Sequence, residues 1–291
     1  MALTTSIKTL PQATGAGTAA SSALARLETP AEEGALDESE VDSWQSSLAE
    51  ATAEDILHWA LDRWPRRVAL CTAFQAEGSV LLDMAWRIDR NLRVITLDTG
   101  RLPQETHNLI ERVRWRYGIK VEVHTPSNRA VEAMVSAQGP NLFFHSLEGR
   151  RTCCEVRKVE PLRRALAGFD AWITGLRRDQ APSRAGIRRI ELDTVHGGIT
   201  KLNPLADWTH EQVWAAIEER DLPYHPLYDQ GYTSIGCAPC TRPAEEGEDS
   251  RAGRWWWEVG TAKECGLHFG SQGANPLATD GADRPARENR P

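Results

Sequence analysis

Five of the six cysteines in this chain stand where their thiols could do chemistry. Cys153 and Cys154 are adjacent, and Cys237 and Cys240 form a Cys-x-x-Cys unit in a predicted loop. Four thiolates in two tight pairs match the ligand count of a zinc site or an iron–sulfur centre, and ligand type alone leaves both open. Cys265 stands apart in a Glu-Cys-Gly-Leu-His motif, so its thiol is a candidate nucleophile.

Composition limits the class of protein. The 291 residues are 41% hydrophobic, enough for one large α/β domain or two small ones. No apolar run of about 18 residues predicts a membrane span. The net charge of -7 disfavours general nucleic-acid binding. Arginines crowd residues 150–164 and 177–189, which suits either an anionic small molecule or a solvated helix face.

Short apolar runs alternate with helical patterns along most of the chain. We expect strands at 67–73, 92–97, 120–124, 171–174 and 200–203, and helices at 80–88, 103–117, 131–137, from Cys153 towards 166, and at 211–220 with Asp207 or Thr209 as cap. This alternation predicts an α/β fold with a parallel, Rossmann-like sheet covered by helices on both faces. Ligands in such sheets bind beyond the carboxyl ends of the strands, here at the loops after residues 73, 97 and 174. Cys71 is expected to be an inert core residue.

Composition also divides the chain into segments. We expect a disordered extension over 1–40, an ordered domain with the two cysteine pairs over 41–245, a segment with Cys265 over 246–270 and a disordered tail over 271–291. The first segment has too few arginines for a transit peptide, and no apolar signal sequence is visible. Clustered cysteines in such a chain indicate metal binding or catalysis rather than disulfides, and a cytoplasmic location.

Six motifs together resemble one enzyme family. They are the Cys-Cys-Glu-Val-Arg-Lys run at 153–158, Ile-Gly-Cys-Ala-Pro-Cys-Thr-Arg-Pro at 235–243, Arg-Trp-Trp-Trp-Glu at 254–258, Glu-Cys-Gly-Leu-His at 264–268, Leu-Asp-Thr-Gly at 97–100 and Gly-Leu-Arg-Arg-Asp-Gln at 175–180. The combination resembles the thioredoxin-dependent adenylyl-sulfate (APS) reductases of the PAPS/APS reductase family, over roughly 45–270. The 3′-phospho-APS (PAPS) reductases typically lack the two cysteine pairs, so the pairs favour APS as substrate.

The resemblance implies a fold and a cofactor. The fold is an adenine-nucleotide α-hydrolase-like domain, close to the ATP pyrophosphatases, with a mobile C-terminal catalytic tail. The cofactor is one 4Fe–4S cluster on Cys153, Cys154, Cys237 and Cys240, not expected to change oxidation state in turnover. Two adjacent cysteines are awkward ligands for a single tetrahedral ion, which also favours the cluster over zinc.

The resemblance further implies a two-step reduction of APS to sulfite and AMP. The Cys265 thiolate attacks the sulfate sulfur, AMP leaves, and reduced thioredoxin releases sulfite from the resulting S-sulfonate. A mobile tail would serve both steps. Plant-type relatives carry their own thioredoxin-like domain; none follows this tail, so we expect thioredoxin to act in trans. A homo-oligomer is also expected.

Cations must assist this attack, because a thiolate approaching a sulfuryl anion at ~4 Å meets a repulsion of about 4 kcal/mol at an effective dielectric of ~20. By resemblance Lys158, Arg251, Arg254 and His268 supply them. The plainer alternatives are an exposed helix side for the lysine, surface positions for the arginines and an inert tail histidine. The tryptophan run 255–257 is expected to pack rather than to stack on a ligand.

The nucleotide is expected at the loop 72–79, whose backbone N–H groups could bind phosphate at a helix N-terminus. The sequence departs from the family here, with Phe74 and Gln75 where the usual loop has serine and glycine. An ordinary strand–helix turn is the alternative. By resemblance Leu97 and Gly175 border the adenine, and Arg184 pairs with phosphate or ribose. The expected substrate-binding residues are Thr72, Phe74, Gln75, Leu97, Gly175 and Arg184.

Three other functions remain open. A PAPS reductase that holds a metal differs only in substrate. A nucleotide-activating tRNA thiolase or amidase of the pyrophosphatase group would need an RNA-binding surface, which the charge of -7 argues against. A non-enzymatic Fe–S redox sensor would leave the motif at 264–268 without a purpose.

Overall fold

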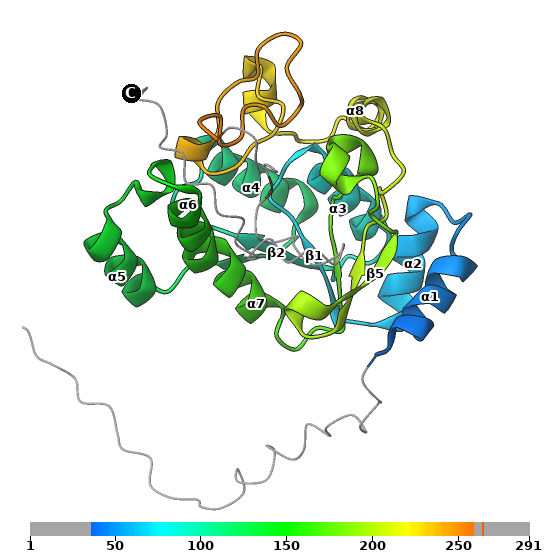
Figure 1. Ribbon diagram of the computed structural model, residues 1–291. Coiled ribbons are helices and arrows are strands. Elements are labelled where there is room, and N and C mark those ends of the chain that lie inside the picture. Colours follow the sequence, from blue (N-terminus) through cyan, green and yellow to red (C-terminus); the bar gives the residue numbers. More distant parts are fainter. Residues whose placement is uncertain (1–35, 259–263, 265–291) are drawn as a thin grey trace, which may run out of the picture. The chain divides into compact units, whose positions relative to one another are not determined.

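The computed structural model describes residues 36–258 and Glu264 (Figure 1). Several predictions fall elsewhere in the chain. Residues 1–35, Cys265, His268 and the tail 271–291 lie outside the described residues, and so do the disorder and mobility predicted for them.

Six strands form one sheet in the order β3-β2-β1-β4-β6-β5. The strands are β1 Val68–Cys71, β2 Arg93–Leu97, β3 Val121–His124, β4 Ala171–Ile173, β5 Ile190–Asp193 and β6 Ile199–Leu202. All neighbours pair in parallel except β5 and β6. The predicted α/β, Rossmann-like fold is confirmed, with an antiparallel edge strand that the sequence did not predict. Only a short turn joins β5 to β6, and so short a connection permits only antiparallel pairing.

Eight α-helices connect and cover these strands in the described part of the chain. They are α1 Glu38–Ser47, α2 Ala53–Arg63, α3 Ala76–Ile88, α4 Gln104–Tyr117, α5 Asn128–Gln138, α6 Leu147–Cys154, α7 Glu160–Leu166 and α8 His210–Glu219. None of the described helices is both long and apolar enough to cross a membrane.

Two helix starts refine the sequence predictions. α1 begins at Glu38, ahead of the domain boundary predicted at residue 41, because the Asp37 side chain accepts a hydrogen bond from the Glu40 N–H and caps the first turn. At α8 the cap is Thr209, one of the two predicted candidates. Its side chain and that of Gln212 form a reciprocal capping box.

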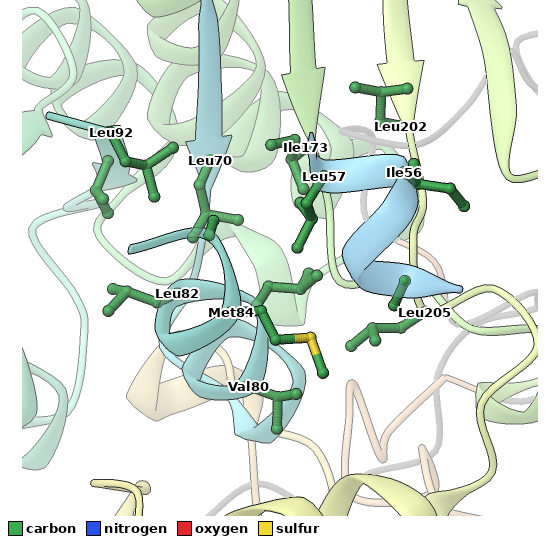
Figure 2. Close-up of a cluster of buried hydrophobic side chains, with 14 of the residues drawn as sticks. Ile56, Leu57, Leu70, Val80, Leu82, Met84, Leu92, Ile173, Leu202 and Leu205 are labelled. Atoms are coloured by element: carbon green, nitrogen blue, oxygen red, sulfur yellow. The ribbon is translucent and has the colours of Figure 1, made fainter. Parts of the chain in front are cut away.

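One face of the sheet carries the main core. Strand register aligns four apolar side chains, fully buried, in one row across β2, β1, β4 and β6: Val94, Leu70, Ile173 and Leu202. Figure 2 shows side chains of α2 and α3 packed beside this row, among them Ile56 from α2 and Met84 from α3. The sheet is thereby fixed against the helices on this side.

Residues of alternate register point to the opposite face, where α7 covers them. Ala69 and Ile95 pack with Ala165, and Trp172 packs with Leu162 and its neighbours on α7. Both faces of the central strands are therefore buried, as the near-continuous apolar sequence of β1 and β4 requires.

Val94→Ala should lower the free energy of unfolding by about 2 kcal/mol, because two fully buried methyl groups are replaced by a cavity. Val123→Ala is the matched control on the adjacent strand β3, where the side chain is 49% exposed, and should cost less than about 0.5 kcal/mol. Urea denaturation of both variants measures the difference. Equal losses would contradict the assignment of the buried face.

Candidate active site

A cavity of about 510 Å³ opens beyond the carboxyl ends of β1, β2 and β4. The sequence predicted that ligands bind at the loops after the first, second and fourth of these parallel strands. Residues at those strand ends line the cavity, among them Thr72, Gln75, Leu97 and Gly175. The segments 228–236 and 248–254 contribute further lining residues. The parallel topology thus gathers residues from distant parts of the chain at one edge of the sheet.

The loop between β1 and α3 places its residues differently from the prediction. Phe74 has φ 55° and its side chain is buried in the main core, so it does not line the cavity. Its N–H donates to the Thr72 hydroxyl at 2.9 Å, so this amide already has a partner inside the loop. The expected contact of Phe74 with substrate is wrong for the side chain, because the left-handed backbone turns the ring inward. The cavity wall continues instead through Ala76, Glu77 and Gly78 at the start of α3.

Gln75 explains the unusual sequence of this loop. Its side-chain Oε1 accepts a hydrogen bond of 2.9 Å from the backbone N–H of Ile235. Ile235 lies two residues before Cys237, the first cysteine of the Cys-x-x-Cys unit. A glycine here could not make this bond, so the side chain of Gln75 joins the loop after β1 directly to the cysteine loop.

Five basic side chains line the cavity: Lys158, Arg177, Arg184, Arg251 and Arg254. Arg177 is neutralised by Glu77 and by Asp179, each at 3.0 Å. Arg254 donates to the Ser234 hydroxyl at 3.2 Å, and its Nε has no hydrogen-bond partner within the described residues. Positive charge therefore exceeds negative charge around Arg254, as an anion site requires.

Gly236 makes room for the Arg254 guanidinium. A Cβ atom at this position would lie 2.6 Å from Cζ of Arg254, closer than side chains can pack. The same guanidinium stacks over the Trp255 ring at 4.7 Å. Arg254 is 5% exposed, so the alternative of a surface arginine is excluded for it.

Arg184 and Arg251 converge on one carboxylate. Arg184 donates from Nε and Nη2 to the two oxygens of Glu264, at 2.9 and 2.8 Å, and Arg251 donates to Oε2 at 3.3 Å. Burial alone would raise the pKa of Glu264, but the hydrogen bonds from Arg184 and the charge of Arg251 lower it. The carboxylate is thus held ionised between two arginines of the cavity wall.

The four paired cysteines meet at a second, smaller cavity. Cys153 and Cys154 end α6, and Cys237 and Cys240 come from the loop that faces it. Lys158 lines both cavities. Among the described residues no group of three or more His, Cys, Asp or Glu side chains is already arranged to hold a metal ion.

A π-helix, η2 Glu155–Val159, follows Cys154 directly and joins α6 to α7. Such turns are rare and occur often at functional sites. Here the turn buries Arg157, which is 8% exposed and donates from Nη1 to the Thr99 carbonyl at 2.7 Å. The predicted helix over these residues is confirmed, but this part of it is not a solvated face.

Polar groups surround the sulfur atoms. The Thr99 hydroxyl and the Cys237 sulfur are 3.2 Å apart. The buried Nε of Arg157 and Nε1 of Trp255 have no partner in the described part of the chain, and both residues line the cysteine cavity. Burial raises the pKa of Cys240 to about 12, so its thiol alone would stay protonated at neutral pH. These unused N–H donors and the four thiols together suit an anionic, sulfur-containing group.

Aromatic packing holds the cysteine loop against α6, because Trp255 lies in one buried cluster with Cys153 of α6 and with Cys237 and Cys240. Trp257 packs on Phe144 at 4.3 Å between ring centroids, and Trp255 is 1% exposed. The prediction that the tryptophan run serves packing is confirmed for these two residues.

Comparison with known proteins identifies the family. The sequence profile of the phosphoadenosine phosphosulfate reductase domain matches residues 67–243. The chain belongs to this family. The resemblance expected from the motifs is thereby confirmed.

Individual relatives agree with the family match. The adenosine 5′-phosphosulfate reductase of Allochromatium vinosum is 50% identical over 201 residues, which cover 69% of this chain and 78% of that protein. The Pseudomonas aeruginosa protein of the same name is 46% identical over 231 residues, covering 78% and 85%. The crystal structure of phosphoadenylyl-sulfate (PAPS) reductase from Candida auris in a phosphate complex superposes with a TM-score of 0.62 at 30% identity, covering 71% of this chain and 98% of that one.

The structure brings together most of the residues that the sequence singled out for this member of the family. Cys71 is an exception, since it lines the 510 Å³ cavity at the end of β1 instead of lying wholly in the core. Burial raises the pKa of its thiol to about 12, so it remains a poor nucleophile. Cys265 and His268 cannot be placed, because they lie outside the described residues.

Sequence reasoning missed three residues of the site: Thr99, Gly236 and Glu264. Each lies within a motif that carried the family resemblance, so the signal was present. Their partners lie far away in the sequence, as with Thr99 and Cys237 or Glu264 and Arg184. Only the fold could show these contacts.

Gly236→Ala should lower kcat/KM for the nucleotide substrate at least about tenfold, because the added Cβ displaces the Arg254 guanidinium from the cavity wall. Ala238→Ser, on an exposed position of the same loop, is the control and should retain activity. Steady-state kinetics and metal content are measured on both. A wild-type kcat/KM in Gly236→Ala would show that turnover does not require the Arg254 guanidinium at this position in the cavity wall.

Proposed function

We propose that this family member reduces adenosine 5′-phosphosulfate to sulfite and AMP in cytoplasmic sulfate assimilation. It is an oxidoreductase that acts on a sulfur group, like the relatives of that name. The observation that carries the proposal is the pair of adjoining cavities, one lined by basic side chains and one by four cysteines, with Lys158 in both walls. Such a site suits a nucleotide whose reacting group is an anion.

The chemistry requires two displacements. The Cys265 thiolate attacks the sulfate sulfur, the bond from that sulfur to the phosphate oxygen breaks, and AMP leaves with the electron pair. One thiolate of reduced thioredoxin then attacks the Cys265 sulfur, and sulfite leaves with the electrons of the S–S bond. The second thioredoxin thiol closes a disulfide and regenerates the Cys265 thiolate. The two electrons that reduce the sulfur therefore come from one dithiol.

Cavity charge makes the first displacement possible. Arg251 and Arg254 lie three residues apart in the turns before the tail, and both side chains line the cavity. With Lys158 they can offset the roughly 4 kcal/mol of repulsion between thiolate and sulfuryl group. Leu97 at the end of β2 and Gly175 after β4, on either side of β1, would border the adenine. His268 is proposed to assist Cys265.

A 4Fe–4S cluster fits the second cavity. Cys153, Cys154, Cys237 and Cys240 would hold it, and the unused donors of Arg157 and Trp255 suit its sulfides. When bound, the cluster supplies a fixed charged group beside Lys158 that tunes the electrostatics of the anion site. The adjacent pair Cys153 and Cys154 is an awkward ligand set for one tetrahedral zinc ion, which favours the cluster.

The substrate distinction concerns a single phosphate. The Allochromatium vinosum and Pseudomonas aeruginosa relatives, at 50% and 46% identity, are named for APS, whereas the superposed Candida auris enzyme is named for PAPS and is 30% identical. Turnover with both nucleotides tests the choice. A higher kcat/KM for PAPS would overturn the assignment of APS.

Cys265→Ser should abolish the covalent adduct. After exposure to APS without thioredoxin, mass spectrometry of the wild-type peptide that contains Cys265 should show an added sulfonate, which the variant lacks although it keeps the visible colour of the cluster. Cys71→Ser is the matched control, since Cys71 lines the nucleotide cavity. An adduct on Cys71, or turnover by Cys265→Ser, would disprove the assigned nucleophile.

Anaerobically purified protein should contain about four iron and four sulfide ions per chain and absorb visible light. Cys240→Ser should lower the iron content, because it removes one of the four thiols in the cavity. Iron, sulfide and zinc assays on both proteins give the answer. One zinc per chain, with no iron, would replace the cluster by a mononuclear site.

A further inference from the structure

Glu264 is the residue immediately before Cys265, and four side-chain contacts hold its carboxylate. Arg184 binds it in bidentate geometry at 2.9 and 2.8 Å. The Ser183 hydroxyl donates to Oε1 at 3.1 Å, and Arg251 donates to Oε2 at 3.3 Å. Glu264 itself is 7% exposed, so this is a buried ion pair rather than a surface contact.

The carboxylate lies behind the cavity wall. Arg184 and Arg251 line the nucleotide cavity, whereas Glu264 is not among the described residues that do so. It therefore contacts two arginines of the cavity wall without itself belonging to the lining. This placement argues against a carboxylate that occupies the position of a substrate anion.

The backbone of Glu264 is held from the direction of the cysteines. Arg150 donates from Nη1 to the Glu264 carbonyl at 3.0 Å. Arg150 lines the cysteine cavity, its guanidinium stacks on Trp255 at 4.4 Å, and its Nε binds Glu258 at 2.5 Å. The side chain of Glu264 thus contacts residues of the nucleotide cavity, and its carbonyl contacts Arg150 in the wall of the cysteine cavity.

These contacts are of the kind that fixes geometry. Bidentate arginine–carboxylate pairs are directional, and breaking a buried pair leaves an uncompensated charge. Two arginines would be left without their counter-ion if Glu264 lost its charge. The orientation of both cavity arginines therefore depends on this carboxylate.

We propose that Glu264 is a positioning residue that docks the segment carrying Cys265 at the nucleotide cavity and orients Arg184 and Arg251 towards the substrate. This inference rests on the proposed role of Cys265 as the nucleophile. It changes the part assigned to Arg184, from a contact of the nucleotide alone to an anchor of the catalytic segment.

The first test needs no substrate. In Glu264→Gln, which keeps the size of the side chain but not its charge, iodoacetamide should alkylate Cys265 about tenfold faster than in the wild type, because the segment is no longer docked. Peptide mass spectrometry follows the rate. The control is Glu248→Gln, whose carboxylate lines the same cavity but pairs with Arg242 at 2.8 Å. An unchanged rate in Glu264→Gln would overturn the proposal.

A second test measures single-turnover formation of the sulfonate. At saturating APS, Glu264→Gln should react about 100-fold more slowly, because a nucleophile misplaced by about 1 Å loses this much. AMP should bind no more tightly than to the wild type. Tighter AMP binding with an undiminished rate would mean that the carboxylate competes with substrate, which contradicts docking.

Glu264→Asp separates charge from size. It retains the charge with a shorter reach, so its alkylation rate should lie between those of the wild type and Glu264→Gln. If Glu264→Gln does not fold, as judged by circular dichroism and cluster absorbance, the comparison of Glu264→Asp with the wild type decides. If Glu264→Gln folds, an alkylation rate for Glu264→Asp above that of Glu264→Gln would contradict docking by charge. If Glu264→Gln does not fold, a rate for Glu264→Asp equal to that of the wild type would show that the carboxylate contacts do not hold the segment.

The two proposals can fail separately. If wild-type protein forms no sulfonate from APS, the proposed function is wrong. The alkylation rates still determine whether Glu264 docks its segment, since they require neither nucleotide nor turnover.

Discussion

Repulsion among buried cations is the constraint on which this site depends. Burying a guanidinium costs several kcal/mol unless a counter-charge and hydrogen bonds compensate it. Glu77 compensates Arg177, and Glu264 compensates Arg184 and Arg251. Towards Arg254 the described residues supply only neutral acceptors. The cavity thus keeps a positive end, and an anionic substrate is the natural partner for it.

The sheet and the cysteine loop position different parts of the site. Parallel strands with both faces buried form a rigid edge, and the loops after β1, β2 and β4 place the cavity there. The cysteines depend instead on a π-turn after α6 and on aromatic packing around Trp255. Lys158 lies between the cavity at the sheet edge and the cysteine cavity. It follows Cys154 by four residues and lines both cavities.

Much of this arrangement could be predicted from the sequence. Apolar runs bounded by loops located the five parallel strands β1, β2, β3, β4 and β6. Paired cysteines located the second cavity. The antiparallel strand β5 was missed because Ile190–Asp193 is short and mixes apolar with acidic residues. Phe74 was misplaced because a single positive φ reverses the direction of its side chain, and no pattern reports one dihedral angle. Glu264 was quoted within a motif, but Arg184, which binds it in bidentate geometry, lies 80 positions away.

The bond from Gln75 to the Ile235 amide has a consequence for redesign of this scaffold. A backbone donor at the entrance of the Cys-x-x-Cys loop is satisfied by a side chain from another loop, so the two segments must be exchanged together. Transplanting residues 235–243 into a homologue with glycine in place of Gln75 would leave that amide unpaired and buried, at a cost of about 1–3 kcal/mol. Chimaeras of this family should therefore tolerate the swap only when both loops come from the same parent.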